Sequence, residues 1–218
     1  MNTITSDPNA LSVQFGCGVV CPVGWLNYDV SPTMIVSKIP LMGKIFRLPA
    51  WNPRTKYGNV VKGLPVPDKS CVRVYSDQVL EHLALEDFRT ALRNIHRILM
   101  VGGTFRFFVP DIAYCVNLYL EGVKHDNPDA MHDLTIGTGM GLKTRRHGML
   151  GRFLESLGNS RHQWGWDEAS VRKELTDAGF HGIRRIYYRD SEDVMFKAIE
   201  DYSEYRDSQK SQGMEARR

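Results

Sequence analysis

The sequence lacks the features that place a chain in a membrane or on nucleic acid. No apolar run approaches the roughly 18 residues of a membrane-spanning helix. The opening residues, MNTITSDPNA, contain no basic segment followed by an apolar run, which is the pattern of a secretory leader. The net charge of +3 is too small to indicate a nucleic-acid partner. We therefore expect a soluble cytoplasmic protein that binds neither membrane nor nucleic acid.

Cysteine pairs with metal-binding spacing are also lacking. The sequence has no CxxC motif of the kind that structural zinc needs, and its four cysteines are Cys17, Cys21, Cys71 and Cys115. Free thiols in a reducing compartment are the expected state. The chain has 218 residues and 42% hydrophobic content, enough for one domain with its own core. We expect this domain over residues 1–200 and a polar tail over 201–218, with monomer and homodimer both open.

The most regular pattern in the chain lies between Val72 and Asp111. Apolar residues recur every three or four positions from Leu85 to Leu99, which predicts an amphipathic helix with one face packed on a core. We expect the glycine pair at 102–103 to end this helix. The apolar segment at 104–109 then predicts a buried strand, so that the stretch forms half of a parallel α/β unit.

A glycine turn follows the first expected strand, at 11–15. Gly16 and Gly18 let the backbone turn tightly and leave room for a ligand against the main chain. The second expected strand, at 25–30, places Asp29 near its end, 11 residues past Gly18. Dinucleotide-binding folds usually separate these features by about 20 residues, which includes a crossover helix that holds phosphate. The short gap argues against a pyrophosphate cofactor and is compatible with a ligand that has a ribose and no phosphate.

The remaining elements alternate along the chain. We expect an interrupted helix within 31–51, a third strand at 57–61 and a central strand from 71 to 75, followed by the helix and strand described above. A helix begins after Asp111, another begins after Asp167 and ends at Gly179, and a sixth strand follows at 183–188. This order predicts an α/β protein with a Rossmann-like, doubly wound and mainly parallel sheet.

Five ordered motifs carry a resemblance to a known family. They are FGCG…GWLNYD, YGNVVKGLPVPDKS, VYSDQVLEHL, ALRNIHRILMVGGTFRFFVPD and RHQWGWDEASVRKELTDAGF, and the resemblance that they carry covers roughly residues 11–193. The set resembles a small class I S-adenosylmethionine-dependent methyltransferase, of the compact type associated with bacterial polysaccharide and glycan synthesis. The resemblance implies S-adenosylmethionine as cofactor and a seventh, antiparallel strand, for which the sequence offers no clear position.

The resemblance implies cofactor contacts after the first two strands. Gly16, Cys17 and Gly18 are expected beside the methionine and ribose parts of the cofactor, and Asp29 is expected to bind the ribose hydroxyls.

It also implies contacts after the third and fourth strands. Asn59 and Val60 are expected near the adenine, where the family commonly has an aspartate in place of Asn59. Ser76, Asp77 and Gln78 are expected beside the sulfonium and its methyl group.

The chemistry of methyl transfer narrows the choice of catalytic residues. A hydroxyl acceptor must lose a proton, and a neutral histidine is the side chain best suited to take it near pH 7. His82, just past the fourth strand, is the first candidate for general base, with Glu81 as its orienting partner or as a helix N-terminal charge; His162 is the second and His147 the third. Asp111 is expected to orient the base or bind the acceptor, to cap the helix that follows it, or both. No carboxylate cluster predicts a metal site, so dependence on a divalent metal stays open.

A glycine-rich insert at 126–166 is long for a plain loop, and we expect it to act as a substrate lid. Its basic segment at 143–147, with Arg145 and Arg146, would bind an anionic substrate such as a sugar phosphate or an acidic glycan; the alternative is a solvated loop. Arg161 would bond the hydroxyls of a sugar. Trp164 and Trp166 would cover the apolar face of a sugar, or anchor the lid to the core.

These expectations combine into one predicted function. The sequence predicts an S-adenosylmethionine-dependent O-methyltransferase that acts on a hydroxyl of a small-molecule sugar or an oligosaccharide, with a histidine as general base. Two alternatives remain: an O- or N-methyltransferase of a non-carbohydrate small molecule, and a cofactor-binding protein without catalysis.

Overall fold

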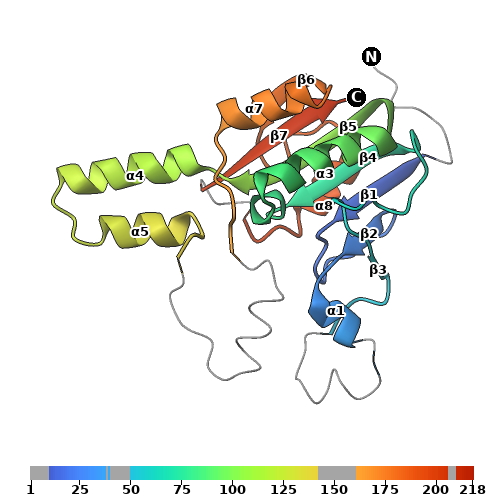
Figure 1. The fold of residues 1–218 in the computed structure, drawn as a ribbon, viewed down its shortest axis with the longest axis horizontal. Helices are drawn as coiled ribbons and strands as arrows, with labels where there is room; N and C mark the ends of the chain where they lie inside the picture. Colours follow the sequence, from blue (N-terminus) through green and yellow to red (C-terminus); the bar gives the residue numbers. More distant parts are fainter. Residues whose placement is uncertain (1–9, 38, 40–49, 142–160, 206–209) are drawn as a thin grey trace.

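One sheet organises the molecule, seen in a computed structural model that describes residues 10–37, 39, 50–141, 161–205 and 210–218. Its seven strands run in the order β3-β2-β1-β4-β5-β7-β6 (Figure 1). Their bounds are β1 Leu11–Phe15, β2 Leu26–Asp29, β3 Thr55–Tyr57, β4 Cys71–Asp77, β5 Leu99–Pro110, β6 His181–Ile186 and β7 Ser211–Arg217. The first five strands in this order are parallel to one another, whereas β7 is antiparallel to both β5 and β6. The predicted doubly wound, mainly parallel α/β sheet is confirmed.

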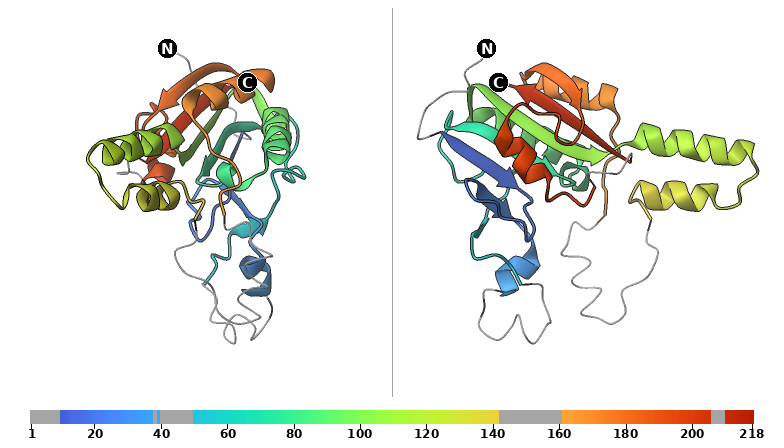
Figure 2. Two further views of the ribbon diagram at one scale, coloured as in Figure 1. Left: turned by 60° about the vertical axis from the view of Figure 1, so that its left-hand side comes forward. Right: turned by 180° about the vertical axis from the view of Figure 1, so that it is seen from behind.

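Helices cover both faces of this sheet (Figure 2). The helical elements are α1 Pro32–Ser37, the 3₁₀ helix η1 Leu80–His82, α3 Leu85–Ile98, α4 Ile112–Lys124, α5 Ala130–Gly137, α7 Glu168–Asp177 and α8 Val194–Glu200. The larger apolar core lies on the face covered by α3 and α7. A smaller one, which includes Trp25, Tyr75 and Phe108, lies under α8 on the other face. Among the described residues, none of the helices combines the length and hydrophobicity needed to cross a bilayer.

Helix α3 has the predicted apolar face but ends earlier than its pattern suggests. Phe88, Leu92 and Ile95 are fully buried on the sheet. Leu99 already pairs with Cys71 as the first residue of β5, so the glycine pair does not cap the helix. Gly102 instead lies inside β5 with a φ of 77°, a backbone conformation that glycine adopts without strain. The expected glycine cap is therefore wrong, because the chain passes directly from helix to strand.

The C-terminal strand corrects a second expectation. Residues 201–218 were expected to form a polar tail, yet Ser211–Arg217 forms β7 and its five central residues are buried between β5 and β6. Only Met214 and Ala216 are apolar among these five, so the strand has too weak a hydrophobic signal to be recognised. This is the antiparallel strand that the resemblance implied.

A buried arginine fastens β7 to its neighbours. Arg106 on β5 is fully buried, and its guanidinium donates to Glu215 on β7 at 2.9 Å and to Asp190 at 2.7 Å. It also bonds Glu200 on α8. A buried charge is stable only when it is paired and hydrogen-bonded, and this network meets both conditions.

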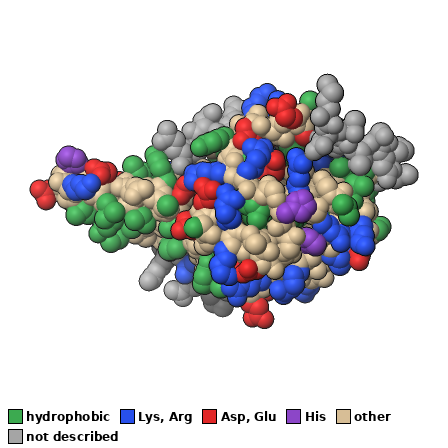
Figure 3. Space-filling model, turned by 90° about the horizontal axis from the view of Figure 1, so that it is seen from above, with side chains coloured by type: hydrophobic (Ala, Val, Ile, Leu, Met, Phe, Trp, Pro, Cys, Tyr) green, Lys and Arg blue, Asp and Glu red, His purple; other side chains and the backbone are tan. Residues whose placement is uncertain are grey.

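Helices α4 and α5 form a hairpin that projects from the sheet (Figures 1 and 2). Cys115 and Ala130 are their only buried residues. Hydrophobic side chains gather along the hairpin's surface (Figure 3), and Leu118, Leu120 and Met131 are about half exposed. The hairpin includes the start of the glycine-rich insert, whose residues 142–160 lie outside the described part of the chain.

Candidate active site

The first half of the site lies where β1 and β2 end. Gly16 and Gly18 turn the chain with φ values of 65° and 53°. The buried carboxylate of Asp29 accepts hydrogen bonds from the Gly18 N–H at 2.8 Å and from the Ser31 N–H at 2.7 Å. The aspartate thus ties the turn after β1 to the turn after β2, and both of its oxygens already have donors.

A cavity of about 270 Å³ adjoins this turn. Its walls include Gly16, Val30, Asn59, Val60 and Val79. A Cβ on Gly16 would lie 2.2 Å from the Val79 Cγ2, so the turn has no room for a side chain. A glycine floor, apolar walls and an adjacent carboxylate are the groups that a nucleoside requires, and we conclude that the residues fit the nucleoside part of S-adenosylmethionine.

Two of the expected cofactor residues use their side chains elsewhere. The Asn59 Oδ1 accepts from the N–H groups of Val61 and Lys62, at 2.8 and 3.1 Å, and so closes its own turn. The Cys17 thiol is buried beside Thr55, and burial raises its pKa, so it stays neutral. Both residues lie where strands end, Cys17 after β1 and Asn59 after β3, as expected. Cys17 can contribute its backbone to this part of the site, but it does not offer a reactive thiolate.

The end of β4 carries the three residues expected beside the methyl group. Ser76 is fully buried, and its Oγ has no hydrogen-bond partner among the described residues. Asp77 accepts from the Tyr188 hydroxyl at 3.0 Å, and burial raises the pKa of its carboxyl group. Gln78 turns the chain with a φ of 53° and donates from Nε2 to the Ser211 Oγ at 2.9 Å. The two polar side chains therefore hold the end of β4 to the chain around β6 and β7.

The second half of the site is a cluster of Glu81, His82 and His162, which we call the Glu–His–His cluster. Glu81 and His82 belong to η1, directly after β4, while His162 comes from a segment some eighty residues later. The two imidazole rings meet edge to face with centroids 4.8 Å apart. Each Nε2 faces the same oxygen, Glu81 Oε1, at 3.9 Å from His82 and 3.8 Å from His162. The structure thus brings together the first two candidate bases.

Backbone contacts hold the cluster in place. The N–H groups of Gln163 and Trp164 donate to the Glu81 carbonyl at 2.8 and 3.2 Å, and the Gln163 amide donates to the His82 carbonyl at 2.9 Å. The His162 Nδ1 lies 2.7 Å from the Thr138 carbonyl at the end of α5. These bonds join η1, the end of α5 and the segment at 161–164.

One glycine makes room for the His162 ring. Gly139 has a φ of 66°, and a Cβ there would lie 2.3 Å from the ring atoms of His162. Sequence reasoning missed both Thr138 and Gly139, since their role depends on which ring packs against the end of α5. No local pattern signals such a contact.

Burial sets the charge of the cluster. Glu81 is 1% exposed, neither of its side-chain oxygens has a described hydrogen-bond partner, and burial raises its pKa to about 8. Burial also lowers the pKa of His82, against a smaller opposite effect of the Arg161 carbonyl. The distances of 3.8–3.9 Å from Glu81 Oε1 to the two Nε2 atoms would suit ion pairs, but they are too long for hydrogen bonds. The raised pKa of Glu81 and the lowered pKa of His82 both disfavour the charged forms of these groups. We therefore regard Glu81 and His82 as neutral in the resting protein, and of these two side chains His82 is the one that can accept a proton.

Asp111 is not part of this cluster, and both of its carboxylate oxygens have hydrogen-bond partners. Its Oδ1 accepts from the Tyr114 N–H at 3.1 Å, which confirms the predicted helix cap, and its Oδ2 accepts from Arg185 at 2.7 Å. Both oxygens thus hold the start of α4 against β6, and its expected role toward the acceptor stays a prediction.

The two tryptophans differ in exposure. Trp166 is 1% exposed and its ring centroid lies 4.1 Å from that of Phe88 in the main core. It anchors the segment to the core and offers no face to a sugar, which corrects one of its two expected roles. Trp164 is 40% exposed and keeps its role as a candidate. Arg161 lies beside the cluster through its carbonyl, 3.1 Å from the His82 Nδ1, while Arg145, Arg146 and His147 lie outside the described residues.

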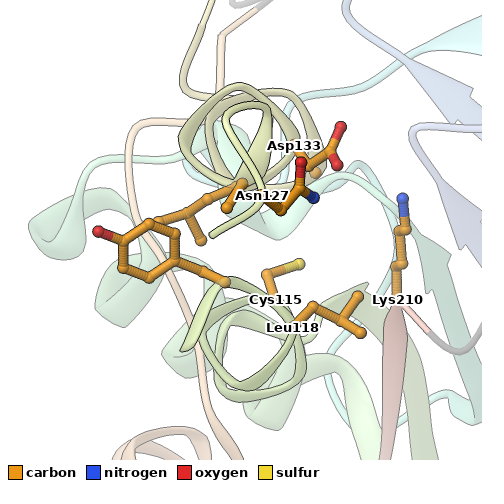
Figure 4. Close-up of a pocket in the computed structure, with 9 residues that line it drawn as sticks. Cys115, Leu118, Asn127, Asp133 and Lys210 are labelled. Atoms are coloured by element: carbon orange, nitrogen blue, oxygen red, sulfur yellow. The ribbon is translucent and has the colours of Figure 1, made fainter. Parts of the chain in front are cut away.

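A second cavity, of about 340 Å³, lies between α4 and α5 (Figure 4). Cys115 and Leu118 line it from α4, Asn127 and Asp133 from the α5 side, and Lys210 reaches it from the start of β7. The cavity belongs to the projecting hairpin and shares no lining residue with the cavity beside Gly16.

Comparison with known proteins identifies the domain. Residues 13–107, from β1 into β5, match the family described as "Methyltransferase domain". This match supports a methyltransferase. No curated protein matches it in sequence.

Solved structures agree with this domain in fold. An S-adenosylmethionine-dependent methyltransferase from Archaeoglobus fulgidus is 13% identical, over 97% of this chain and 87% of that chain, with a TM-score of 0.51. One from Mesorhizobium loti is 18% identical, over 96% and 91% of the two chains, with a TM-score of 0.50. The fold is that of class I methyltransferases. Together with the matched domain it supports an enzyme whose cofactor is S-adenosylmethionine.

The two halves of the site can be compared with the two requirements of methyl transfer, a bound cofactor and a group that can take a proton. When bound, S-adenosylmethionine supplies an electrophilic methyl group on a sulfonium. Its nucleoside part would be held by Gly16, Gly18, Asp29 and Val60. Near the end of β4, the buried Ser76 hydroxyl has no described hydrogen-bond partner. The Glu–His–His cluster follows directly along the chain, so η1 joins the cofactor half to the half that can take a proton.

Proposed function

We propose that this methyltransferase acts on a hydroxyl of a sugar or glycan, with a histidine of the Glu–His–His cluster as the general base. The observation that carries the proposal is the convergence of two imidazole Nε2 atoms on one buried carboxylate, directly after the strand whose end faces the cofactor. A base placed there lies on the acceptor side of the domain.

A hydroxyl acceptor explains why the site needs such a base. Alcohols are poor nucleophiles while protonated, and a neutral imidazole with a pKa near or below its ordinary value takes up a proton near pH 7. Burial lowers the pKa of His82 and so keeps it unprotonated in the resting protein.

The exposed indole of Trp164 supports a carbohydrate acceptor. Trp164 lies two residues from His162, and its backbone N–H donates to the Glu81 carbonyl, so the residue that carries this indole is held next to the cluster. An aromatic face covers the apolar side of a sugar ring while polar groups bond its hydroxyls. The resemblance to methyltransferases of glycan synthesis points to the same acceptor class.

The decisive experiment is a screen of sugars, oligosaccharides, phenols and amines for release of the demethylated cofactor. We expect turnover with a carbohydrate hydroxyl. Turnover with amines alone would overturn the acceptor class, and the absence of any turnover with normal cofactor binding would favour a binding protein without catalysis.

Substitution of the histidines tests the base. We expect His162→Asn and His82→Asn each to lower kcat by about 10²- to 10⁴-fold, with unchanged cofactor affinity by isothermal titration calorimetry. The matched control is His132→Asn, because His132 is an exposed histidine of α5 that lies 4.0 Å from Asp129 and outside the cluster. Full turnover in both cluster variants would show that the base lies elsewhere.

A further inference from the structure

We propose that the Glu–His–His cluster is a binding site for a divalent transition-metal ion of the Zn²⁺ or Co²⁺ type. One ligand atom from each of Glu81, His82 and His162 lies within 4.8 Å of the other two. This inference goes beyond the proposed function, because it concerns the ion that the cluster takes up and holds whether or not the acceptor is a sugar.

The two histidines are in the tautomer that metal binding requires. The Nδ1 of His82 lies 3.1 Å from the Arg161 carbonyl, and the Nδ1 of His162 lies 2.7 Å from the Thr138 carbonyl. A carbonyl can only accept, so each Nδ1 carries the hydrogen and each Nε2 presents a lone pair. Metal-binding histidines in proteins are oriented in this way, with the second ring nitrogen bonded to a backbone carbonyl or a carboxylate.

The carboxylate of Glu81 provides the independent evidence for a ligand. Its side chain is 1% exposed and both oxygens lack a hydrogen-bond partner in the described part of the chain. A buried carboxylate without a partner costs several kcal/mol unless it is neutralised or paired. Two N–H groups donate to the Glu81 carbonyl and fix its backbone. The Glu81 side chain is directed at the two Nε2 atoms, 3.9 and 3.8 Å from its Oε1, and not at solvent.

The donor set indicates the class of ion. Two imidazoles and one carboxylate form the ligand set of several catalytic zinc sites, which leave a further position open. Calcium and magnesium prefer oxygen ligands throughout, so they fit this cluster poorly. Bonds of about 2.0–2.2 Å place the ligand atoms of such an ion about 3.0–3.6 Å apart, a little closer than the present 3.8–3.9 Å. Small inward rotations of the side chains are sufficient to close the Glu81 contacts.

The ion and the general base use the same atoms. An Nε2 lone pair that coordinates a metal cannot also take a proton from an acceptor. The occupied cluster therefore has no free imidazole base, and an acceptor hydroxyl would depend on the Lewis acidity of the ion instead. The effect of the ion on turnover separates these two chemistries.

Direct titration of the chelator-treated full chain with Zn²⁺ and Co²⁺ tests the site. We expect one equivalent to bind, with visible Co²⁺ absorption of a low-coordinate nitrogen–oxygen site, and a Zn²⁺-dependent rise in Tm. Glu81→Gln, His82→Gln and His162→Asn should each weaken binding by about 100-fold or more, since each removes a ligand. His132→Asn, the exposed control, should bind as the wild type does.

Unchanged Zn²⁺ affinity in all three ligand variants would overturn the proposal, because the four cysteines or other groups would then be responsible. Absence of binding to the wild type would overturn it as well. The three variants remove different ligands, so a failure of one to fold, seen by circular dichroism, leaves the other two informative.

The metal titration contains neither cofactor nor acceptor, so absence of metal binding would not contradict the proposed function. Absence of turnover in the acceptor screen would likewise not contradict the metal site. In the turnover assay, inhibition by one equivalent of Zn²⁺ supports a histidine base. Activation supports Lewis-acid chemistry and would overturn the base assignment while it supports the site.

Discussion

Two buried carboxylates, at the end of β2 and just after β4, have opposite surroundings. Asp29, after β2, accepts two backbone N–H groups at 2.8 and 2.7 Å. Glu81, after β4, is equally buried and has no described hydrogen-bond partner. The Asp29 carboxylate is already stabilised by hydrogen bonds when no ligand is bound. The buried Glu81 carboxylate has no such bonds within the described residues and needs a proton or a cation to offset its charge. The comparison teaches that the cofactor half is built by backbone geometry and the proton-accepting half by side chains that await a partner.

Two glycines test this division with the largest expected effect. Gly16→Ala places a Cβ 2.2 Å from Val79, and Gly139→Ala places one 2.3 Å from the His162 ring, both at positive φ. We expect Gly139→Ala to lower kcat by about 100-fold, the usual result of an ångström-scale displacement, with unchanged cofactor affinity. Gly16→Ala should instead weaken cofactor binding, measured by calorimetry. Loss of cofactor affinity in both variants would show that the halves are not separate.

Neutral amides at the two carboxylates should change stability in opposite directions. Asp29→Asn leaves one backbone N–H without an acceptor, so we expect the free energy of unfolding to fall by about 1–3 kcal/mol. Glu81→Gln removes a buried ionisable group, and we expect the metal-free protein to become more stable by about 1–3 kcal/mol at neutral pH. Urea denaturation of both variants in a chelating buffer measures the difference. A loss of stability in Glu81→Gln would reveal a partner for its carboxylate.

The pH dependence of stability sharpens the same contrast. Burial raises the pKa of Glu81 to about 8 in the folded protein, above its ordinary value. From about pH 5 to about pH 8 the unfolded chain releases this proton while the folded protein holds it, so the Glu81 contribution to stability falls as pH rises. The difference in unfolding free energy between wild type and Glu81→Gln should therefore grow over this range and then level off. A difference independent of pH would place an ionised carboxylate in the folded protein.

The smallest expected effect concerns Trp164. Its backbone N–H, which an alanine retains, bonds the Glu81 carbonyl, and its exposed indole is not part of the cluster. Trp164→Ala should therefore raise the KM for a sugar acceptor a few-fold and leave kcat and cofactor affinity nearly unchanged. Tyr187→Ala, at a 70% exposed aromatic residue after β6, is the control and should change neither constant. An equal effect on kcat would mean that the indole also positions the cluster.

Local patterns in the sequence predicted the sheet and the local structure after β1 and β2. The glycine turn after β1, Asp29 at the end of β2 and the apolar face of α3 are short-range features, and the structure contains all three. The cluster was predicted only as two alternative bases, because the contact between His82 and His162 depends on the fold and not on their spacing. Arg106, inside the apolar strand FRFFVP, was the one unusual residue of β5, but its three carboxylate partners are far apart in the sequence.

The place of β7 in the sheet has a consequence for how the chain folds. β5 pairs with β7 across roughly a hundred residues, and β6 has only β7 as its described neighbour in the sheet. Such long-range pairing forms slowly, because the entropy of closing the intervening loop must be overcome first. Until β7 arrives, β5 presents an open edge and Arg106 lacks the carboxylate of Glu215. Binding of β7 thus covers the open edge of β5 and adds the carboxylate of Glu215 to the partners of the buried Arg106.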